Sequence, residues 1–192
     1  MTTTELVEGI LKREGSTYTH DSAAGDPPTR FGVTPTALKA YRRKVLGWTV
    51  ARSRVTADDI RALTRDEAIL VYRHLYIEGP QFDKIPDRLV RLLVVDWGVH
   101  SGPPLAARKL QKAVGQVLKI ALVVDGVVGR KTLAAVNRAN GWAIAHRLIL
   151  LRAEHQAVII RRSVLAACPS ALKRTKLRYD WGWRRRHLGL LA

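Results

Sequence analysis

Apolar residues recur at helical spacing along most of this 192-residue chain, and this periodicity limits the fold more than any other feature. The first such stripe consists of Leu6, Val7, Ile10 and Leu11. It follows threonines at positions 2 to 4, which are good helix N-caps. A second helix is predicted from Thr34-Pro35, an N-cap followed by proline, to Leu46, where Gly47 ends it.

Further helices follow from the same signals. Thr64 and Glu67 form a capping box before an amphipathic stretch that ends ahead of Gly79. Pro86 begins a mostly apolar segment, read as a central buried helix that ends at Gly102. Three more helices are predicted over residues 105–114, 131–137 and 142–167. Strand-like alternation occurs from Thr29 to Val33, so we expect a mainly α-helical protein with a small N-terminal β-hairpin.

Composition narrows the class of protein further. The chain is 47% hydrophobic and has one cysteine, Cys168, which excludes an intramolecular disulfide and a zinc site built from thiolates. No run of 18 uncharged apolar residues is present, so no membrane-spanning helix is predicted. The first residues lack the features of a secretory signal, so work outside the cytoplasm would require another route of export.

Charge is distributed unevenly over a net formal value of +17. Residues 1–96 hold 15 basic and 13 acidic side chains, whereas residues 97–192 hold 18 basic and 3 acidic ones. A strongly cationic half favours a polyanionic partner, such as nucleic acid, anionic lipid or a bacterial envelope polymer. Charge alone does not distinguish these partners.

One acidic residue occupies a helix face that is otherwise apolar. Glu14 lies four residues after Ile10 and close to Asp21, Asp26 and Thr29 in sequence. A carboxyl at such a position is partly desolvated, which favours the protonated form that a general acid needs, while a carboxylate in a wetter loop stays ionised. Such a pair is the minimum for glycoside hydrolysis, but the same residues are also compatible with an exposed helix end and ordinary turns.

The N-terminal motif resembles a known family. Arg13-Glu14-Gly15, then Tyr18, Asp21, Thr29 and Phe31-Gly32-Val33-Thr34, is similar to the signature of the glycoside hydrolase family 108 muramidases. The resemblance implies that Glu14 is the catalytic residue. The hairpin differs from the family pattern, because Ala24 stands where the family has aspartate. The second carboxylate is therefore Asp26 or Asp21, or the enzyme uses Glu14 with a water positioned by Thr29.

A second resemblance covers the later part of the chain. The segments 95–102, 106–115 and 124–133, with Gly182-Trp183, look like the peptidoglycan-binding region that follows the muramidase motif in the same family. Here His100 replaces the usual asparagine. Asp125 fits either a turn or a sugar contact, Gln111 either an interior hydrogen bond or a ligand contact, and Trp183 either packing or sugar stacking. The predicted substrate-binding residues are Tyr18, Asp96, His100, Gln111, Asp125 and Trp183.

These resemblances imply a lysozyme-like enzyme. We expect a muramidase region over residues 1–85 and a basic peptidoglycan-binding region over residues 86–192, packed as one unit. The expected activity is bacteriolytic cleavage of the β-1,4 bond between N-acetylmuramic acid and N-acetylglucosamine in Gram-negative peptidoglycan. An endolysin with this activity is made in the host cytoplasm and reaches the periplasm by holin-type release. A bacterial toxin or a gene-transfer component with the same activity is equally compatible with the sequence. We expect the enzyme to bind no metal, cofactor or nucleic acid. We also expect it to be a monomer.

The alternative is a basic nucleic-acid-binding protein without enzymatic activity. Two capped segments between Thr56 and His74 resemble a helix-turn-helix in outline. The second of them carries Glu67, Ile69 and Leu70, which are poor readers of base edges.

Overall fold

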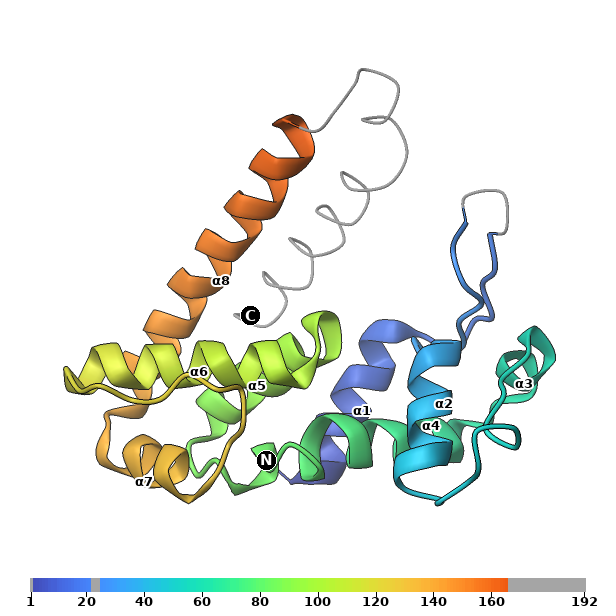
Figure 1. Cartoon of the computed structure of the whole chain (residues 1–192), viewed down its shortest axis with the longest axis horizontal. Helices are drawn as coiled ribbons and strands as arrows, with labels where there is room; N and C mark the ends of the chain where they lie inside the picture. Colours follow the sequence, from blue (N-terminus) through green and yellow to red (C-terminus); the bar gives the residue numbers. More distant parts are fainter. Residues whose placement is uncertain (1, 22–24, 166–192) are drawn as a thin grey trace. The chain divides into compact units, whose positions relative to one another are not determined.

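The computed structural model describes residues 2–21 and 25–165 of the chain. Cys168 and Trp183 lie outside these residues. The chain divides into two compact units, Met1–Ile149 and Leu150–Ala192. All contacts considered below lie within the first unit. The described residues are mostly helical (Figure 1), which confirms the predicted mainly α fold class.

The first helix follows the sequence prediction closely. Helix α1 (Thr3–Glu14) is capped by Thr2, whose hydroxyl accepts from the Glu5 amide while the Glu5 carboxylate accepts from the Thr2 amide. Its apolar stripe is buried in the core. Glu14 is the last residue of α1 and Gly15 is its C-cap.

The N-terminal hairpin contains less β-structure than predicted. Its two arms meet at an isolated antiparallel bridge between Thr19 and Thr29. The expected strand from Thr29 to Val33 is wrong, because Phe31 and Gly32 have positive φ values of 54° and 72°. They form a tight turn closed by the Val33 amide, which donates to the Arg30 carbonyl at 2.9 Å.

The turn leads into four short helical elements. Helix α2 (Pro35–Lys44) has the predicted Thr34 cap but ends two residues before Leu46. Helix α3 (Ala57–Ala62) and helix α4 (Arg65–Tyr72) both begin with capping boxes. Helix α4 continues into a π-helical segment, η1 (Arg73–Glu78), which the sequence did not predict.

The alternative helix-turn-helix interpretation does not fit this packing. Helix α4 would be the recognition helix, yet its Ala68, Val71 and Tyr72 are buried in the core. Helix α4 packs against α1 and α2. The face of α4 that remains exposed carries Asp66 and Glu67, whose negative charges would repel DNA phosphates.

The centre of the unit is a pair of packed helices, α5 (Arg88–Ser101) and α6 (Pro103–Leu118). A 3₁₀ turn, η2 (Phe82–Lys84), precedes them and buries the Phe82 ring against α5. Asp87 caps α5 by accepting from the Val90 amide at 2.9 Å, so this helix begins two residues after the predicted Pro86. Gly115 was predicted to end α6 but lies within it, and the helix ends at Lys119 in the left-handed conformation.

The last elements are α7 (Arg130–Arg138) and α8 (Gly141–Leu165), which agree with the predicted helices to within a few residues. The loop between α6 and α7 contains the predicted tight turn at Gly126, where φ is 86°. Among the described residues, no helix is both long enough and apolar enough to span a bilayer. The predicted boundary between residues 85 and 86 stays a prediction.

Candidate active site

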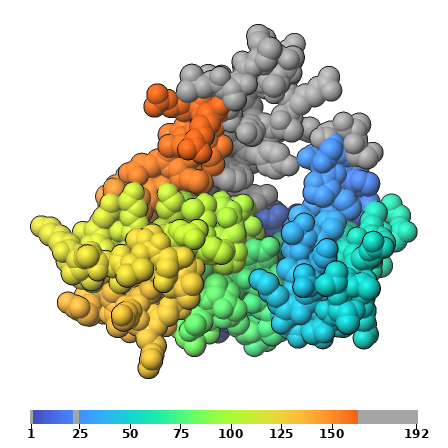
Figure 2. Space-filling model, viewed as in Figure 1, coloured from blue at the N-terminus to red at the C-terminus, as the bar shows by residue number. Residues whose placement is uncertain are grey.

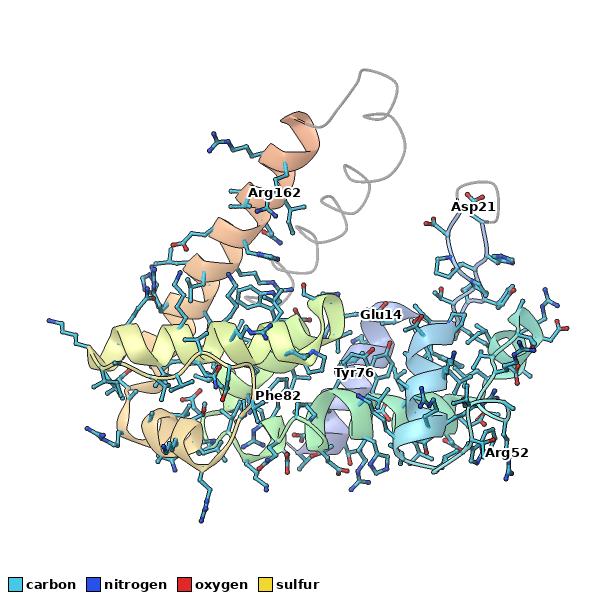
Figure 3. The ribbon with its side chains drawn as sticks, in the orientation of Figure 1. Glu14, Asp21, Arg52, Tyr76, Phe82 and Arg162 are labelled. Atoms are coloured by element: carbon cyan, nitrogen blue, oxygen red, sulfur yellow. The ribbon has the colours of Figure 1, made fainter. Side chains whose placement is uncertain are left out.

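The Glu14 side chain lies beside Gly32, which has no side chain of its own. A Cβ atom placed on Gly32 would be 2.7 Å from both Cγ and Oε2 of Glu14, and 2.7 Å from the Tyr72 hydroxyl oxygen. The Tyr72 hydroxyl donates to the Phe31 carbonyl at 2.8 Å and is thereby fixed. The tight turn, α1 and α4 thus meet around the Glu14 carboxyl, and Figure 3 shows Glu14 near Tyr76.

Two tyrosines stand on one side of this carboxyl. The rings of Tyr72 and Tyr76 are 5.6 Å apart between centroids. Burial and then the negative charge of Glu14 raise the pKa of the Tyr76 hydroxyl above its usual value. Tyr76 lies in η1, and π-helical segments are frequent at functional sites. Neither tyrosine was selected from the sequence, although their spacing of four on a capped helix places them on one face.

The end of α1 is tied to α5 by a buried ion pair. Arg13 Nη2 lies 3.3 Å from Asp96 Oδ1, and the Asp96 side chain is only 1% exposed. His100 Nε2 lies 3.6 Å from the same carboxylate oxygen. Asp96 and His100 were both predicted to bind substrate, but this arrangement gives Asp96 a structural role next to Glu14. Their contact with substrate stays a prediction.

The remaining candidate catalytic residues, Thr29, Asp21 and Asp26, lie at different distances from the base of the hairpin. The hydroxyl oxygens of Thr29 and Thr19 are 2.8 Å apart at the bridge. Asp21 and Asp26 lie two or three residues further out, where the Asp26 amide donates to the Asp21 carbonyl at 2.9 Å. Two residues of extended chain span roughly 7 Å. Figure 3 shows Asp21 at the outer part of the hairpin, so the structure does not bring it next to Glu14.

Tyr18 lies in the first arm of the hairpin. The Arg61 guanidinium stacks over its ring, 4.8 Å from the centroid. Its hydroxyl oxygen is buried and has no hydrogen-bond partner within residues 2–21 and 25–165. Tyr18 is thus half-buried between the hairpin and α3, and its contact with substrate stays a prediction.

Gln111 and Asp125 form a separate cluster that organises the loop before α7. Gln111 is 1% exposed, and its side-chain amide donates to Asp125 Oδ1 at 2.7 Å and to the Val127 carbonyl at 3.0 Å. Its side-chain oxygen accepts from the Gly126 amide at 2.9 Å. The Gln111 hydrogen bond, together with one from the Val127 amide, lowers the pKa of Asp125. These contacts favour the structural interpretation of both residues over sugar binding, and Trp183 lies outside the described residues.

Together, the site and fold define a class of protein. A helical unit holds one carboxyl between a tight turn and two tyrosines, at the base of a hairpin that bears further carboxylates. A fixed carboxylic acid near a second carboxylate is the arrangement by which glycoside hydrolases protonate a leaving oxygen and stabilise the resulting cation. Glu14 fits the first of these roles and the hairpin carboxylates are candidates for the second, so the site is compatible with a glycoside hydrolase.

The comparisons with known proteins identify the family. The chain belongs to the glycosyl hydrolase 108 family, which matches residues 7–102. Among solved structures it is similar to Brucella abortus SagA, with 27% sequence identity and a TM-score of 0.70 over 98% of this chain and 90% of that chain. No curated protein matches its sequence. The family and the structural match support a peptidoglycan hydrolase.

Proposed function

We propose that this protein is a muramidase, which cleaves the β-1,4 bond between N-acetylmuramic acid and N-acetylglucosamine with Glu14 as general acid. The observation that carries the proposal is the contact between the Glu14 carboxyl and the backbone of Gly32, beside Tyr72. The Glu14 carboxyl thus lies at the junction of α1, the hairpin and α4, in space that the missing side chain of Gly32 leaves open. A general acid must be held in this way to reach one oxygen atom of a long polymer.

In the proposed reaction, the Glu14 carboxyl donates its proton to the glycosidic oxygen as the bond from that oxygen to the anomeric carbon breaks. The developing positive charge on the sugar is met by water, which Thr29 orients and a hairpin carboxylate, Asp26 or Asp21, activates. Both carboxylates lie beyond the Thr19–Thr29 bridge. Either of them reaches the reaction only if the outer hairpin approaches Glu14 when the glycan binds. The stereochemical outcome follows from the carboxyl separation in that bound state.

The direct test is Glu14→Gln, which keeps the size of the side chain but removes its transferable proton. General-acid catalysis contributes roughly 10² to 10⁴ in rate, so clearing of chloroform-permeabilised Gram-negative cells should slow at least about 100-fold. Glu8→Gln is the matched control, because Glu8 lies on the same helix, is half exposed and pairs with the surface residue Arg65. Normal clearing by Glu14→Gln would reject the assignment, and an equal loss in Glu8→Gln would indicate damage to α1.

The bond cleaved is tested separately by mass spectrometry of digests of purified peptidoglycan sacculi. A muramidase releases fragments with muramic acid at the reducing end. Fragments with reducing-end glucosamine instead would keep Glu14 as the general acid but reject the proposed bond. Replacing Asp21 and Asp26 by asparagine, one at a time, identifies the second carboxylate by the variant that loses turnover.

The biological setting is proposed from the substrate and the charge. We propose a monomeric, bacteriolytic endolysin of a bacteriophage, made in the host cytoplasm and acting on Gram-negative peptidoglycan in the periplasm after holin-type release. The basic half of the chain supports this role, because its positive field attracts anionic envelope polymers. Wall binding through this field should weaken as salt rises.

A further inference from the structure

The loop between α2 and α3 combines exposed cations with exposed apolar side chains. We call residues 43–54 the basic loop; they comprise the last two residues of α2 and most of the loop that follows, and contain no acidic residue. Its exposed apolar side chains are Val45, Leu46 and Val50, which are 39%, 44% and 61% exposed. Its cations are Arg43, Lys44, Arg52 and Arg54, all of them exposed. The segment therefore offers both apolar contact and positive charge to a partner.

The cations of the basic loop are not neutralised by neighbours. None of the four forms an ion pair within the part of the chain that the structure describes. The nearby acids are already engaged, since Asp59 pairs with Arg42 at 2.8 Å and Asp58 with Arg61 at 2.9 Å. The positive charge of the loop is therefore available to an external anionic partner.

The basic loop is also held in shape before any partner arrives. The Trp48 ring lies between the guanidinium groups of Arg42 and Arg52, which are 5.2 Å and 4.4 Å from its centroid. The Arg42 guanidinium also donates to the Arg54 carbonyl at 2.9 Å. Buried Ser53 donates to the Val50 carbonyl at 3.0 Å. A preformed loop loses little conformational entropy on binding, which favours association.

We propose that the basic loop docks on the surface of an anionic lipid bilayer. The cations would meet lipid phosphates while Val45, Leu46 and Val50 enter the boundary between headgroups and acyl chains. Charge alone would equally suit an anionic polymer. The three exposed aliphatic side chains distinguish the two partners, because a polymer phosphate gives them nothing apolar to contact.

The basic loop lies far enough from the candidate active site for the enzyme to bind a membrane and its glycan substrate at the same time. Helix α2 begins three residues after Gly32, at the candidate active site, and the loop follows its other end. Ten helical residues span about 15 Å, so the bilayer and the glycan site would be separated by about that distance. In Figure 3, Arg52 lies at the far end of α2 from Glu14, and in Figure 2 this segment forms the surface, drawn in cyan.

The test uses the full chain and co-sedimentation with vesicles of phosphatidylcholine that contain about 30% phosphatidylglycerol. Removing two cations with Arg43→Gln/Lys44→Gln should weaken partitioning roughly 30-fold at low salt. Replacing the apolar pair with Leu46→Ser/Val50→Ser should weaken it about 5-fold or more. Vesicles of phosphatidylcholine alone should bind the unaltered protein much more weakly.

The matched control is Lys131→Gln/Arg138→Gln, which removes two exposed cations from α7. An equal loss of partitioning in this control would overturn the proposal, since binding would then follow the overall charge. If Leu46→Ser/Val50→Ser binds vesicles normally while Arg43→Gln/Lys44→Gln binds both vesicles and sacculi poorly, the loop recognises polyanions and the lipid assignment is wrong. Vesicle binding is measured without turnover, so it stands or falls independently of the proposed muramidase reaction.

Discussion

Replacement of Gly32 by alanine tests whether the position of Glu14 matters as the structure indicates. The added methyl group would lie 2.7 Å from Cγ and Oε2 of Glu14 and from the Tyr72 hydroxyl oxygen. Ordinary contacts begin near 3.4 Å, so the Glu14 side chain and the Tyr72 hydroxyl must each give way by about 0.7 Å, or the turn itself must shift. The hydrogen bond to Phe31 ties Tyr72 to this turn, and we expect the Glu14 carboxyl to be displaced relative to both.

The expected magnitude has two separate parts. A misplacement of about 1 Å in a catalytic group lowers turnover by about 100-fold, so kcat on soluble glycan fragments should fall by that order. The φ of +72° at Gly32 also strains any alanine there, which costs about 1 to 2 kcal/mol of folding free energy. Each kcal/mol corresponds to a melting-temperature decrease of about 2 to 4 °C in a chain of this size.

Gly47→Ala separates these two effects. Gly47 has a similar φ of +67°, but an added Cβ would meet nothing within 4 Å. We expect Gly47→Ala to lose only the stability that backbone strain costs, which is less than the loss in Gly32→Ala, and to keep its kcat. The measurements are thermal unfolding and initial rates on the two variants side by side. A folded Gly32→Ala protein with kcat near that of the unaltered enzyme would refute the importance of this contact.

Three further predictions follow from the described contacts. Asp96→Asn should lower the free energy of unfolding by about 1 to 3 kcal/mol and also lower kcat, because it releases Arg13 and the end of α1. Thermal unfolding checks the first effect, and rates at saturating substrate check the second. Gln111→Ala should cost about 3 kcal/mol with little change in kcat on short soluble glycans, since it leaves several buried groups of the loop before α7 unpaired. The Arg42 hydrogen bond lowers the pKa of Asp59 from 3.8 to about 2, so the stabilisation is present above pH 3.8 and is lost as pH falls toward 2. The melting-temperature difference between Asp59→Asn and the unaltered protein should therefore shrink across that window, and a constant difference would contradict the ion pair.

Much of the helical structure could be read from the sequence because its determinants are local. The capping residues Thr2 and Thr64 and the proline at position 35 act within one turn of the helices that they begin. The boundaries that were wrong involve competing local signals. The N-cap of α5 is Asp87, so the helix begins after it and not at Pro86. Gly115 lies within α6, and the C-cap of that helix is Lys119.

The candidate site shows the limit of this approach. Glu14 could be identified from the sequence because it lies on an otherwise apolar helix face. Its catalytic role was implied by the resemblance to the family. The sequence did not reveal that Tyr76 flanks this carboxyl, nor that the segment from Thr29 to Val33 is a turn. Side-chain alternation predicted a strand there, but the positive φ values of Phe31 and Gly32 override it.

The sequence by itself determined the helical class, most of the helix starts and the glutamate at the end of α1, since each depends on residues within a few positions. Only the tertiary structure decided that Gly32 and Tyr72 meet Glu14, and that Asp96 reaches Arg13. These groups are far apart along the chain. Their proximity arises from the packing of whole helices, which depends on all core side chains together and is not encoded in any single segment.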